Sequence, residues 1–331
     1  MAGQKILLEL TLEHPEFARA EAEAVSISLE DKCNRIDERL MLIESHKGWE
    51  IYAKRLAFTR CISEYIGAFE SIDDLSRHIE DLYLEGKRCA VRVIARGELR
   101  KSVPELERQI GSHVSRKAKI DLQNPEVEIR IYAGQKWIAA RKIAEVERSS
   151  FDRRHSRHRA FSMPISLHPK YARGLLNLCQ VGEGKRVLDP FAGTGGILIE
   201  AVLLGAYAVG SDIDERMVSG IMKNMEQLQL TDGWEVHRLD VRDIRRLGEF
   251  DAVVTDPPYG RSSPGTRDLE ELYIEAMSSM IDVLKPGGML GIVVPDRKLL
   301  TGTDDLELLY SFSQRVHRSL CRNYLVFRLQ R

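Results

Sequence analysis

From residue 182 onward, short apolar runs alternate with segments in which apolar residues recur every three to four positions. The first pattern is typical of buried strands and the second of amphipathic helices. We expect strands at residues 185–189, 206–212, 234–239, 251–255 and 289–294, and helices at 196–204 and 214–229. Strands that alternate with helices at this spacing predict a parallel sheet covered on both faces. Two further apolar segments, 315–320 and 323–329, predict an antiparallel hairpin at the sheet edge.

The first 147 residues mix strands and helices more loosely. Residues 90–95 and 127–132 alternate between apolar and polar side chains, as half-buried strands do. Between them, residues 103–117 fit a helix, and Ser102 and Glu105 have the spacing of a capping box at its start. A chain of 331 residues is long enough for two or three domains, so we expect this part to form an α+β region with its own core.

Charge is distributed unevenly along the chain. The net charge is only -1, but residues 86–119 carry ten Lys or Arg against three Asp or Glu, and residues 148–159 carry five Arg against one Asp. The second segment has one large apolar residue, Phe151, and cannot bury itself. We therefore expect a domain boundary there, in an exposed basic linker. Two basic segments of this kind are typical of a protein that binds a polyanion.

Other features of the sequence exclude several classes of protein. The five cysteines, at positions 33, 61, 89, 179 and 321, lie far apart and form no CxxC. They predict neither a disulfide framework nor a zinc site, and a reducing cytoplasm is the simplest location. No apolar run approaches the roughly 18 residues that span a bilayer. We therefore expect a cytoplasmic protein that uses no metal and has no membrane partner.

A glycine-rich loop follows the first strand of the second half. Residues 187–196 read Val-Leu-Asp-Pro-Phe-Ala-Gly-Thr-Gly-Gly and open a helix. Glycine lets the backbone turn sharply and approach a ligand, toward which the helix N-terminus points its N–H groups. Gly193 and Gly195 partly match the dinucleotide fingerprint, but its third glycine would fall at Leu198. The loop alone also fits a tight turn without a ligand.

Three carboxylates narrow the choice of ligand. Asp212 ends the second strand, where an acid can accept hydrogen bonds from both ribose hydroxyls. Asp240 ends the third strand and could accept from an adenine amino group, with Ile213 and Val241 against the ring faces. Asp189, beside the glycine loop, suits a ligand with cations, such as the ammonium and sulfonium of S-adenosylmethionine, and would repel a pyrophosphate. Each acid alone could be a helix cap, but all three stand at strand carboxyl ends, where ligands bind in such sheets.

The most specific signal in the chain is Asp256-Pro257-Pro258-Tyr259, directly after a predicted buried strand. An exocyclic amine of a nucleobase is a poor nucleophile because its lone pair is delocalised into the ring. The Asp256 carboxylate and the Pro257 carbonyl can each accept one N–H, which aims the lone pair at a methyl group. Proline fixes φ and has no N–H, so this acceptor edge is rigid. Tyr259 offers a ring on which an extruded base can stack.

These motifs resemble those of the class I amino-methyltransferases, and specifically the archaeal and eukaryotic THUMP-containing tRNA guanine-N2 methyltransferases that act on guanosine 10. The resemblance rests on D-P-F-A-G-T-G-G, G-S-D-I-D and T-D-P-P-Y-G. In the first half, residues 90–93, 105–107, 110–111 and 119–125 are similar to the THUMP RNA-binding domain. THUMP strands often carry an aromatic residue near position 90, where this chain has Ala90.

The resemblance implies an α/β fold in which an α+β THUMP-type RNA-binding region precedes a Rossmann-like class I methyltransferase domain with a mostly parallel seven-stranded sheet. It places a ferredoxin-like domain at residues 1–57, THUMP at 58–147, a basic linker at 148–160 and the methyltransferase domain at 161–331. S-adenosylmethionine would be the cofactor and tRNA the partner, with room for a small activator subunit. The product would be mono- or dimethylguanosine.

The motifs and the resemblance together assign residues to three roles, and they assign no residue as a metal ligand. Catalysis is assigned to Asp256, Pro257 and Tyr259. Cofactor binding is assigned to Ser166, Pro169, Asp189, Phe191, Gly193, Thr194, Gly195, Gly196, Asp212, Ile213, Asp240 and Val241, of which Ser166 and Pro169 belong to a segment that in the family helps to hold the methionine end. RNA binding is assigned to Arg92, Arg96, Arg100, Lys101, Arg116, Lys117, Lys119, Arg153, Arg154, Arg157 and Arg159.

Three other functions stay open on this reasoning. The first is N2-methylation of another tRNA guanosine, such as position 6. The second is a DNA amino-methyltransferase, which shares the chemistry of the tetrapeptide but would need a target-recognition module where this chain has THUMP-like residues. The third is an RNA-binding protein with a degenerate methyltransferase fold, against which the intact motifs argue.

Overall fold

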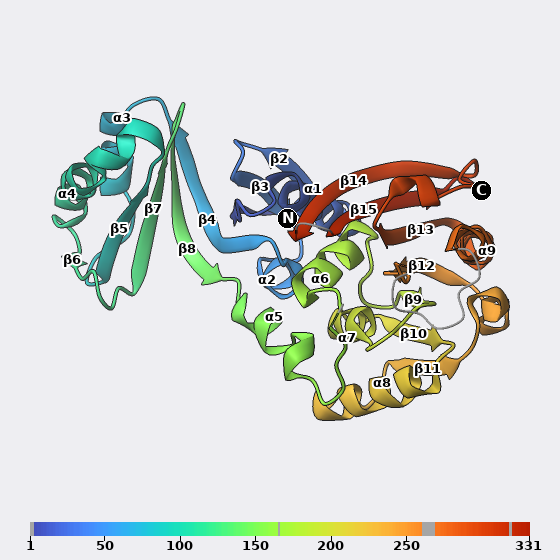
Figure 1. The fold of residues 1–331 in the computed structure, drawn as a ribbon. Helices are drawn as coiled ribbons and strands as arrows, with labels where there is room; N and C mark the ends of the chain where they lie inside the picture. The colour runs from blue at the N-terminus through green and yellow to red at the C-terminus, as the bar shows by residue number, and fades with distance from the viewer. Residues whose placement is uncertain (1–2, 165, 260–268, 318–319) are drawn as a thin grey trace. The chain divides into compact units, whose positions relative to one another are not determined.

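A computed structural model describes residues 3–164, 166–259, 269–317 and 320–331 (Figure 1). Ile165 and Gly260, which belong to the motifs above, lie outside the described residues. The chain divides into two compact units. The N-terminal unit comprises residues up to Leu10, Asp31–Ala53 and Thr59–Val146, and the C-terminal unit comprises Thr11–Glu30, Lys54–Phe58 and Glu147–Arg331. No helix in the described part of the chain is long and apolar enough to cross a bilayer.

The C-terminal unit contains a seven-stranded sheet in the order β11-β10-β9-β12-β13-β15-β14. The strands are β9 (Arg186–Asp189), β10 (Tyr207–Asp212), β11 (Trp234–Arg238), β12 (Phe250–Thr255), β13 (Leu284–Val294), β14 (Leu306–His317) and β15 (Leu320–Leu329). Strands β9 to β13 pair in parallel, while β15 lies antiparallel between β13 and β14. This confirms the mostly parallel seven-stranded sheet. Because β9, β10 and β12 are parallel neighbours, the residues that follow them meet at one edge.

Helices cover this sheet through apolar side chains. They are α6 (Pro169–Leu178), α7 (Gly196–Leu203), α8 (Glu215–Gln227) and α9 (Leu269–Asp282), and a 3₁₀ turn, η3, spans Val241–Leu247. Tyr273 and Met277 of α9 pack with Leu188, Val253 and Leu290 of the central strands in one buried cluster. The central strands β9, β10, β12 and β13 are largely buried, which explains why they read as apolar runs. The edge strands β11 and β14 are mostly half-buried or exposed.

The last hairpin differs from the expectation in its turn. Residues 321 and 322 were expected to connect the two strands, but both lie within β15, where Cys321 pairs with Arg315 and Arg322 with Gln314. The expected turn position is therefore wrong, although the antiparallel hairpin itself is confirmed. A polar pair in an apolar segment indicated a turn, whereas Arg322 has polar partners far away in the sequence.

Parts of the first 60 residues belong to the C-terminal unit. Helix α1 (Pro15–Ser28) carries the buried Glu21, whose carboxylate accepts hydrogen bonds from the backbone N–H groups of Ala57 (3.0 Å) and Phe58 (2.8 Å). It also accepts one from the Asn177 amide of α6 at 2.8 Å. This buried carboxylate is satisfied by three donors and ties three segments together. The domain boundaries drawn from the sequence stay predictions.

The N-terminal unit has an eight-stranded sheet in the order β2-β3-β1-β4-β8-β7-β5-β6. The strands are β1 (Gln4–Leu10), β2 (Lys32–Arg35), β3 (Leu40–Ser45), β4 (Thr59–Phe69), β5 (Arg88–Ile94), β6 (Lys119–Ile120), β7 (Val127–Ala133) and β8 (Trp137–Glu145). Helices α3 (Ile72–Glu80) and α4 (Val103–Val114) pack on it, and α2 (Glu50–Arg55) follows β3.

The predicted capping box at the start of α4 is wrong. Ser102 ends a 3₁₀ turn (Gly97–Ser102) and already has helical φ and ψ, and its side chain makes no capping hydrogen bond.

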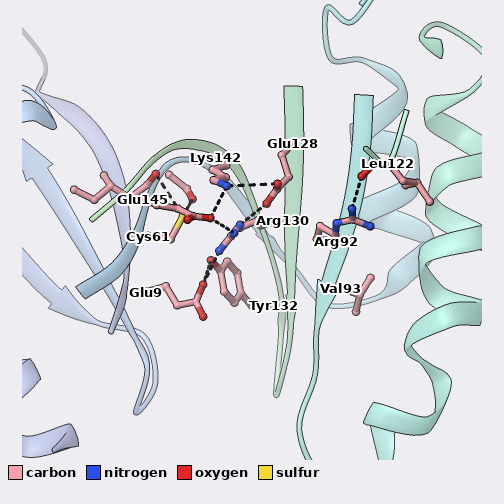
Figure 2. Close-up of polar contacts among 12 residues, drawn as sticks. Glu9, Cys61, Arg92, Val93, Leu122, Glu128, Arg130, Tyr132, Lys142 and Glu145 are labelled. Atoms are coloured by element: carbon pink, nitrogen blue, oxygen red, sulfur yellow. Dashed lines mark hydrogen bonds and ion pairs between the residues drawn. The ribbon is translucent and has the colours of Figure 1, made fainter. Parts of the chain in front are cut away.

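A network of buried charges crosses this sheet (Figure 2). Arg130 of β7 contacts Glu9 of β1 at 2.8 Å and Glu128 at 2.7 Å. The Tyr132 hydroxyl donates to the same Glu9 oxygen at 3.1 Å, and Lys142 of β8 lies 3.6 Å from Glu128. Buried charges are costly unless they are paired and hydrogen-bonded, and these are. The network links β1 to β7 across the intervening strands β4 and β8, and it links β7 to its neighbour β8.

Candidate active site

The glycine loop leads from β9 into α7 and requires two glycines for its shape. Gly193 has φ 51° and Gly195 has φ 77°, both in the left-handed region that side chains disfavour. Gly195 is the N-cap of α7, and no side chain caps this helix. Its N-terminus is therefore available to a ligand. On the neighbouring strand, a Cβ at Gly210 would lie 2.5 Å from Leu198, so this close approach also requires glycine.

Asp212 stands at the end of β10, beside this loop. Its carboxylate accepts the backbone N–H of Gly193 and that of Asp214, both at 3.0 Å. The next residue, Ile213, is 65% exposed, so its side chain is available to cover a ligand. Burial raises the pKa of Asp212, while the two backbone hydrogen bonds lower it. Asp212 is thus held in place at the end of β10. Its assignment to the ribose hydroxyls stays a prediction.

Asp240 does act as a cap in this structure. It precedes η3, accepts the backbone N–H of Arg242 at 3.0 Å and pairs with that residue's guanidinium at 2.7 Å. The hydrogen bond from the Arg242 side chain lowers the pKa of Asp240. Val241 is buried. The assignment of Asp240 to the adenine amino group stays a prediction.

Asp189 is buried at the end of β9, between the glycine loop and the tetrapeptide. Its carboxyl accepts a hydrogen bond from the Thr255 hydroxyl at 2.7 Å and from the backbone N–H of Phe191 at 3.2 Å. Burial raises its pKa to about 7, and the nearby charges of Asp256 and Asp212 add to the effect. A bound cation would relieve this accumulation of negative charge. The residues therefore fit the ammonium and sulfonium of S-adenosylmethionine.

The tetrapeptide follows β12 and faces this acidic edge. The Asp256 side chain is 14% exposed, and its Oδ1 accepts a hydrogen bond from the Tyr259 hydroxyl at 2.5 Å. Pro257 is buried, and the carbonyl of Pro258 accepts from the Tyr273 hydroxyl at 3.3 Å. Burial raises the pKa of Asp256. The two prolines and the Tyr273 contact hold the acceptor edge rigid.

Arg322 belongs to this site, and the sequence reasoning missed it. From β15, its Nε donates to the Tyr259 hydroxyl at 3.2 Å, and its Nη2 lies 3.8 Å from Oδ2 of Asp256. Burial lowers the pKa of Arg322, but Asp256 and Tyr259 more than compensate, so it stays charged. The only feature of the sequence that could have indicated this role was the position of Arg322 beside the apolar residues 324–327.

The segment before α6 reaches the glycine loop. The Ser166 hydroxyl lies 3.4 Å from the Thr194 hydroxyl, and Pro169 occupies the first turn of α6, for which His168 is the N-cap. The structure thus brings Ser166 together with Thr194, whereas Pro169 starts the helix. The described residues contain no group of three or more His, Cys, Asp or Glu side chains that could hold a metal ion.

Comparison with known proteins agrees with this geometry. Residues 156–319 match a family described as RMKL-like, methyltransferase domain. The tRNA (guanine(10)-N2)-dimethyltransferase of Methanothermobacter thermautotrophicus is 37% identical, over 96% of this chain and 97% of that protein. Its counterpart in Pyrococcus abyssi is 34% identical, over 94% and 96%. The chain belongs to the tRNA (guanine(10)-N2)-dimethyltransferase family.

Solved structures show the same fold. TrmN from Thermus thermophilus has a TM-score of 0.58 and 22% identity, covering 98% of this chain and 99% of its own. A methyltransferase complexed with SAH has a TM-score of 0.56 and 16% identity, covering 100% and 99%. These structures show that this chain has the class I methyltransferase fold. Its membership of the methyltransferase family makes S-adenosylmethionine the cofactor.

The candidate RNA-binding residues of the N-terminal unit fall into two groups. Arg92 donates to the Leu122 carbonyl at 2.8 Å (Figure 2), while Arg96 pairs with Glu38, and Arg116 and Lys117 both contact Glu80. The side chains of Arg100, Lys101 and Lys119 are exposed and form no salt bridge in the part of the chain that the structure describes, although backbone hydrogen bonds and also the charge of Lys119 lower the pKa of the nearby Asp121. These three cations are the most accessible to an anion.

The linker is not the exposed tether that its composition indicated. Residues Ser149–Arg153 form a short helix, α5, and the C-terminal unit buries Phe151 and Arg159. Arg154 pairs with the buried Glu200 of α7 at 2.6 Å. The expectation of exposure is thus wrong at Arg154 and Arg159. For Arg154, a carboxylate inside an apolar helix supplies a partner that the linker sequence does not reveal. Arg153 and Arg157 are exposed.

Proposed function

We propose that this chain transfers methyl groups from S-adenosylmethionine to the exocyclic N2 of guanosine 10 in tRNA, giving mono- and then dimethylguanosine. The observation that carries the proposal is the position of Asp256 and Tyr259, at the end of β12, beside the acidic edge formed by Asp189 and Asp212. The relatives that match nearly the whole chain bear the name of this reaction.

The chain's own residues would act on the amine. The cofactor supplies a methyl group on a positively charged sulfur. Ionised Asp256 accepts one N–H of the guanine amine, and the Pro257 carbonyl accepts the other, which directs the lone pair away from the ring. Asp256 is also the nearest base for the proton that the amine loses. Tyr259, held by Arg322, presents its ring to the base.

The N-terminal unit would hold the tRNA. We assign it as the THUMP-type region, with Arg100, Lys101 and Lys119 among its phosphate contacts, because they are exposed cations that form no salt bridge in the described part of the chain. Arg153 and Arg157 extend the basic surface on the C-terminal unit. A small activator subunit and a cytoplasmic location stay predictions from the sequence.

The test is the chemical identity of the product. The purified chain is incubated with methyl-labelled S-adenosylmethionine and unmodified tRNA, and the digested nucleosides are analysed by mass spectrometry. We expect N2-methylguanosine first and N2,N2-dimethylguanosine later, and neither with an Asp256→Ala control. The appearance of the methyl label on adenine or cytosine would refute the proposal. So would methylation of DNA in a parallel incubation when tRNA receives no label.

A further inference from the structure

Arg159 lies in a buried position that its predicted role in RNA binding does not explain. Its side chain is 8% exposed, and its Nε donates to the Arg154 carbonyl at 2.9 Å. One guanidinium nitrogen, Nη1, lies 3.4 Å from the Thr194 hydroxyl in the glycine loop. The other, Nη2, is buried and has no hydrogen-bond partner. A buried cation with an unsatisfied donor is costly, so a ligand that completes it is favoured.

The acid nearest to Arg159 is already paired. Glu200 receives the Arg154 guanidinium at 2.6 Å and the Arg173 guanidinium at 2.8 Å. Both of its carboxylate oxygens are therefore in use, and no ion pair of Arg159 is found among the described residues. Burial lowers the pKa of Arg159 to about 10, and the more distant Glu200 offsets only part of that effect. The guanidinium is still charged at neutral pH.

The start of α7 faces the same guanidinium. A Cβ at Gly196, the first residue of α7, would lie 3.3 Å from Nη1 of Arg159. The helix has no side-chain cap, so its N–H groups and its positive dipole end are available next to the guanidinium. The hydroxyls of Thr194 and Ser166 lie 3.4 Å apart at the same place. A cation, a helix N-terminus and two hydroxyls together form a site for a small anion.

The backbone around Arg159 is held firmly. The Gln227 side chain of α8 accepts from the Ala160 N–H at 2.6 Å and donates to the His158 carbonyl at 3.0 Å. Asn224 accepts from the Phe161 N–H at 2.8 Å and donates to the Thr194 carbonyl at 3.0 Å. The same helix thus anchors both the segment that carries Arg159 and the glycine loop. This preorganises the guanidinium for its ligand.

We propose that Arg159 binds the carboxylate of the cofactor's methionine moiety, together with the Thr194 and Ser166 hydroxyls and the N-terminus of α7. S-adenosylmethionine and SAH each carry one carboxylate, which is the only anionic group of the cofactor. The carboxylates of Asp189 and Asp212 then bind the cationic groups and the ribose hydroxyls of the cofactor, and the Arg159 guanidinium binds its carboxylate. The proposal rests on the proposed function, since it assumes that cofactor.

The test compares two ligands that differ only in the carboxylate. Calorimetry measures the affinity of the full-length protein for SAH and for its decarboxylated analogue, which keeps the adenosine, the thioether and the amine. The wild type should bind SAH at least tenfold more tightly. Arg159→Gln should weaken SAH binding about ten- to a hundredfold, as expected for a charge-assisted hydrogen bond, and change binding of the analogue less than twofold. Arg159→Lys should recover part of the loss, and Arg148→Gln, at an exposed arginine of the same segment, should leave the affinity for both ligands unchanged.

The outcomes separate this proposal from the proposed function. A wild type that binds neither ligand would refute the proposed function itself. A wild type that binds both equally would refute only the role of Arg159, whatever the stability of the variants. Equal weakening of both ligands by Arg159→Gln would show a packing role. An unchanged SAH affinity with a lower salt dependence of tRNA binding would assign Arg159 to an RNA phosphate instead.

Discussion

Replacement of Arg322 by methionine should change the pH dependence of methyl transfer. Methionine keeps much of the apolar volume of the side chain and removes its charge. Burial already raises the pKa of Asp256, while Arg322 lowers it. Without the guanidinium the pKa of Asp256 rises further, so a higher pH is needed to ionise it. The ionised carboxylate is the better acceptor for the amine N–H, and it is the only form of Asp256 that can take up the proton that the amine loses.

The size of the effect follows from the geometry. The charged groups are 3.8 Å apart, and the two side chains are only 7% and 14% exposed. At an effective dielectric constant of about 20, two unit charges about 4 Å apart interact by about 4 kcal/mol, which is an upper bound here. An arginine beside an aspartate typically lowers the carboxyl pKa by about 1–3 units. We expect the acidic limb of the rate profile to move upward by about that amount.

The assay is single-turnover methylation of tRNA at saturating cofactor, measured across a series of pH values. The variant should be most impaired at low pH and should approach a plateau at alkaline pH, where Asp256 ionises without help. Arg328→Met is the matched control, since Arg328 lies exposed on the same strand. A loss by the same factor at every pH would mean that Arg322 acts only on packing or on Tyr259. An unchanged profile would remove it from the site.

Four further results are expected. Asp256→Ala should lower the single-turnover rate about 10²–10³-fold and leave the cofactor affinity within a few-fold of wild type, so near-normal turnover would contradict the catalytic role. Asp212→Ala should weaken cofactor binding by about 1.5–3 kcal/mol in calorimetry, and an unchanged affinity would exclude it from the site. The pKa of Asp189 is raised to about 7, and a cationic ligand favours the ionised form of this carboxyl group. The affinity for S-adenosylmethionine should therefore increase between pH 5.5 and 7.5. The variant Asp189→Asn should show a weaker pH dependence of this affinity. Changing Arg153 and Arg157 to Ala should reduce the salt slope of tRNA binding by about one for each lost phosphate contact, which an affinity series across salt concentrations measures.

Local patterns were enough to predict the central sheet and its catalytic loop. The central parallel strands β9, β10, β12 and β13 are largely buried and read as apolar runs, so the alternation with helices was visible along the chain. Asp256 and Tyr259 are three residues apart, and their chemistry depends on that spacing. The glycines of the loop have the positive φ angles that their residue type permits.

Long-range pairs of charges could not be predicted in the same way. Arg322 meets Tyr259 from 63 positions away, and Arg154 meets Glu200 from 46 positions away. Nothing in either segment by itself distinguishes a buried, paired arginine from an exposed one. The spacing of two apolar segments therefore indicated a turn at Arg322, and the composition of the linker indicated an exposed tether at Arg154. Helix α1 is a similar case, because its partner Asn177 lies in a helix 156 positions from Glu21.

The central claim is that the site around Asp256 modifies the N2 of one particular tRNA guanosine. The most direct measurement uses unmodified tRNA transcripts in which guanosine 10 or guanosine 6 is replaced singly by adenosine, with methyl incorporation counted for each transcript and the modified position mapped. The account predicts full methylation, with up to two methyl groups, when position 6 is changed, and none when position 10 is changed. Methylation that persists without guanosine 10 would contradict it, and methylation that disappears only without guanosine 6 would assign the enzyme to that position instead.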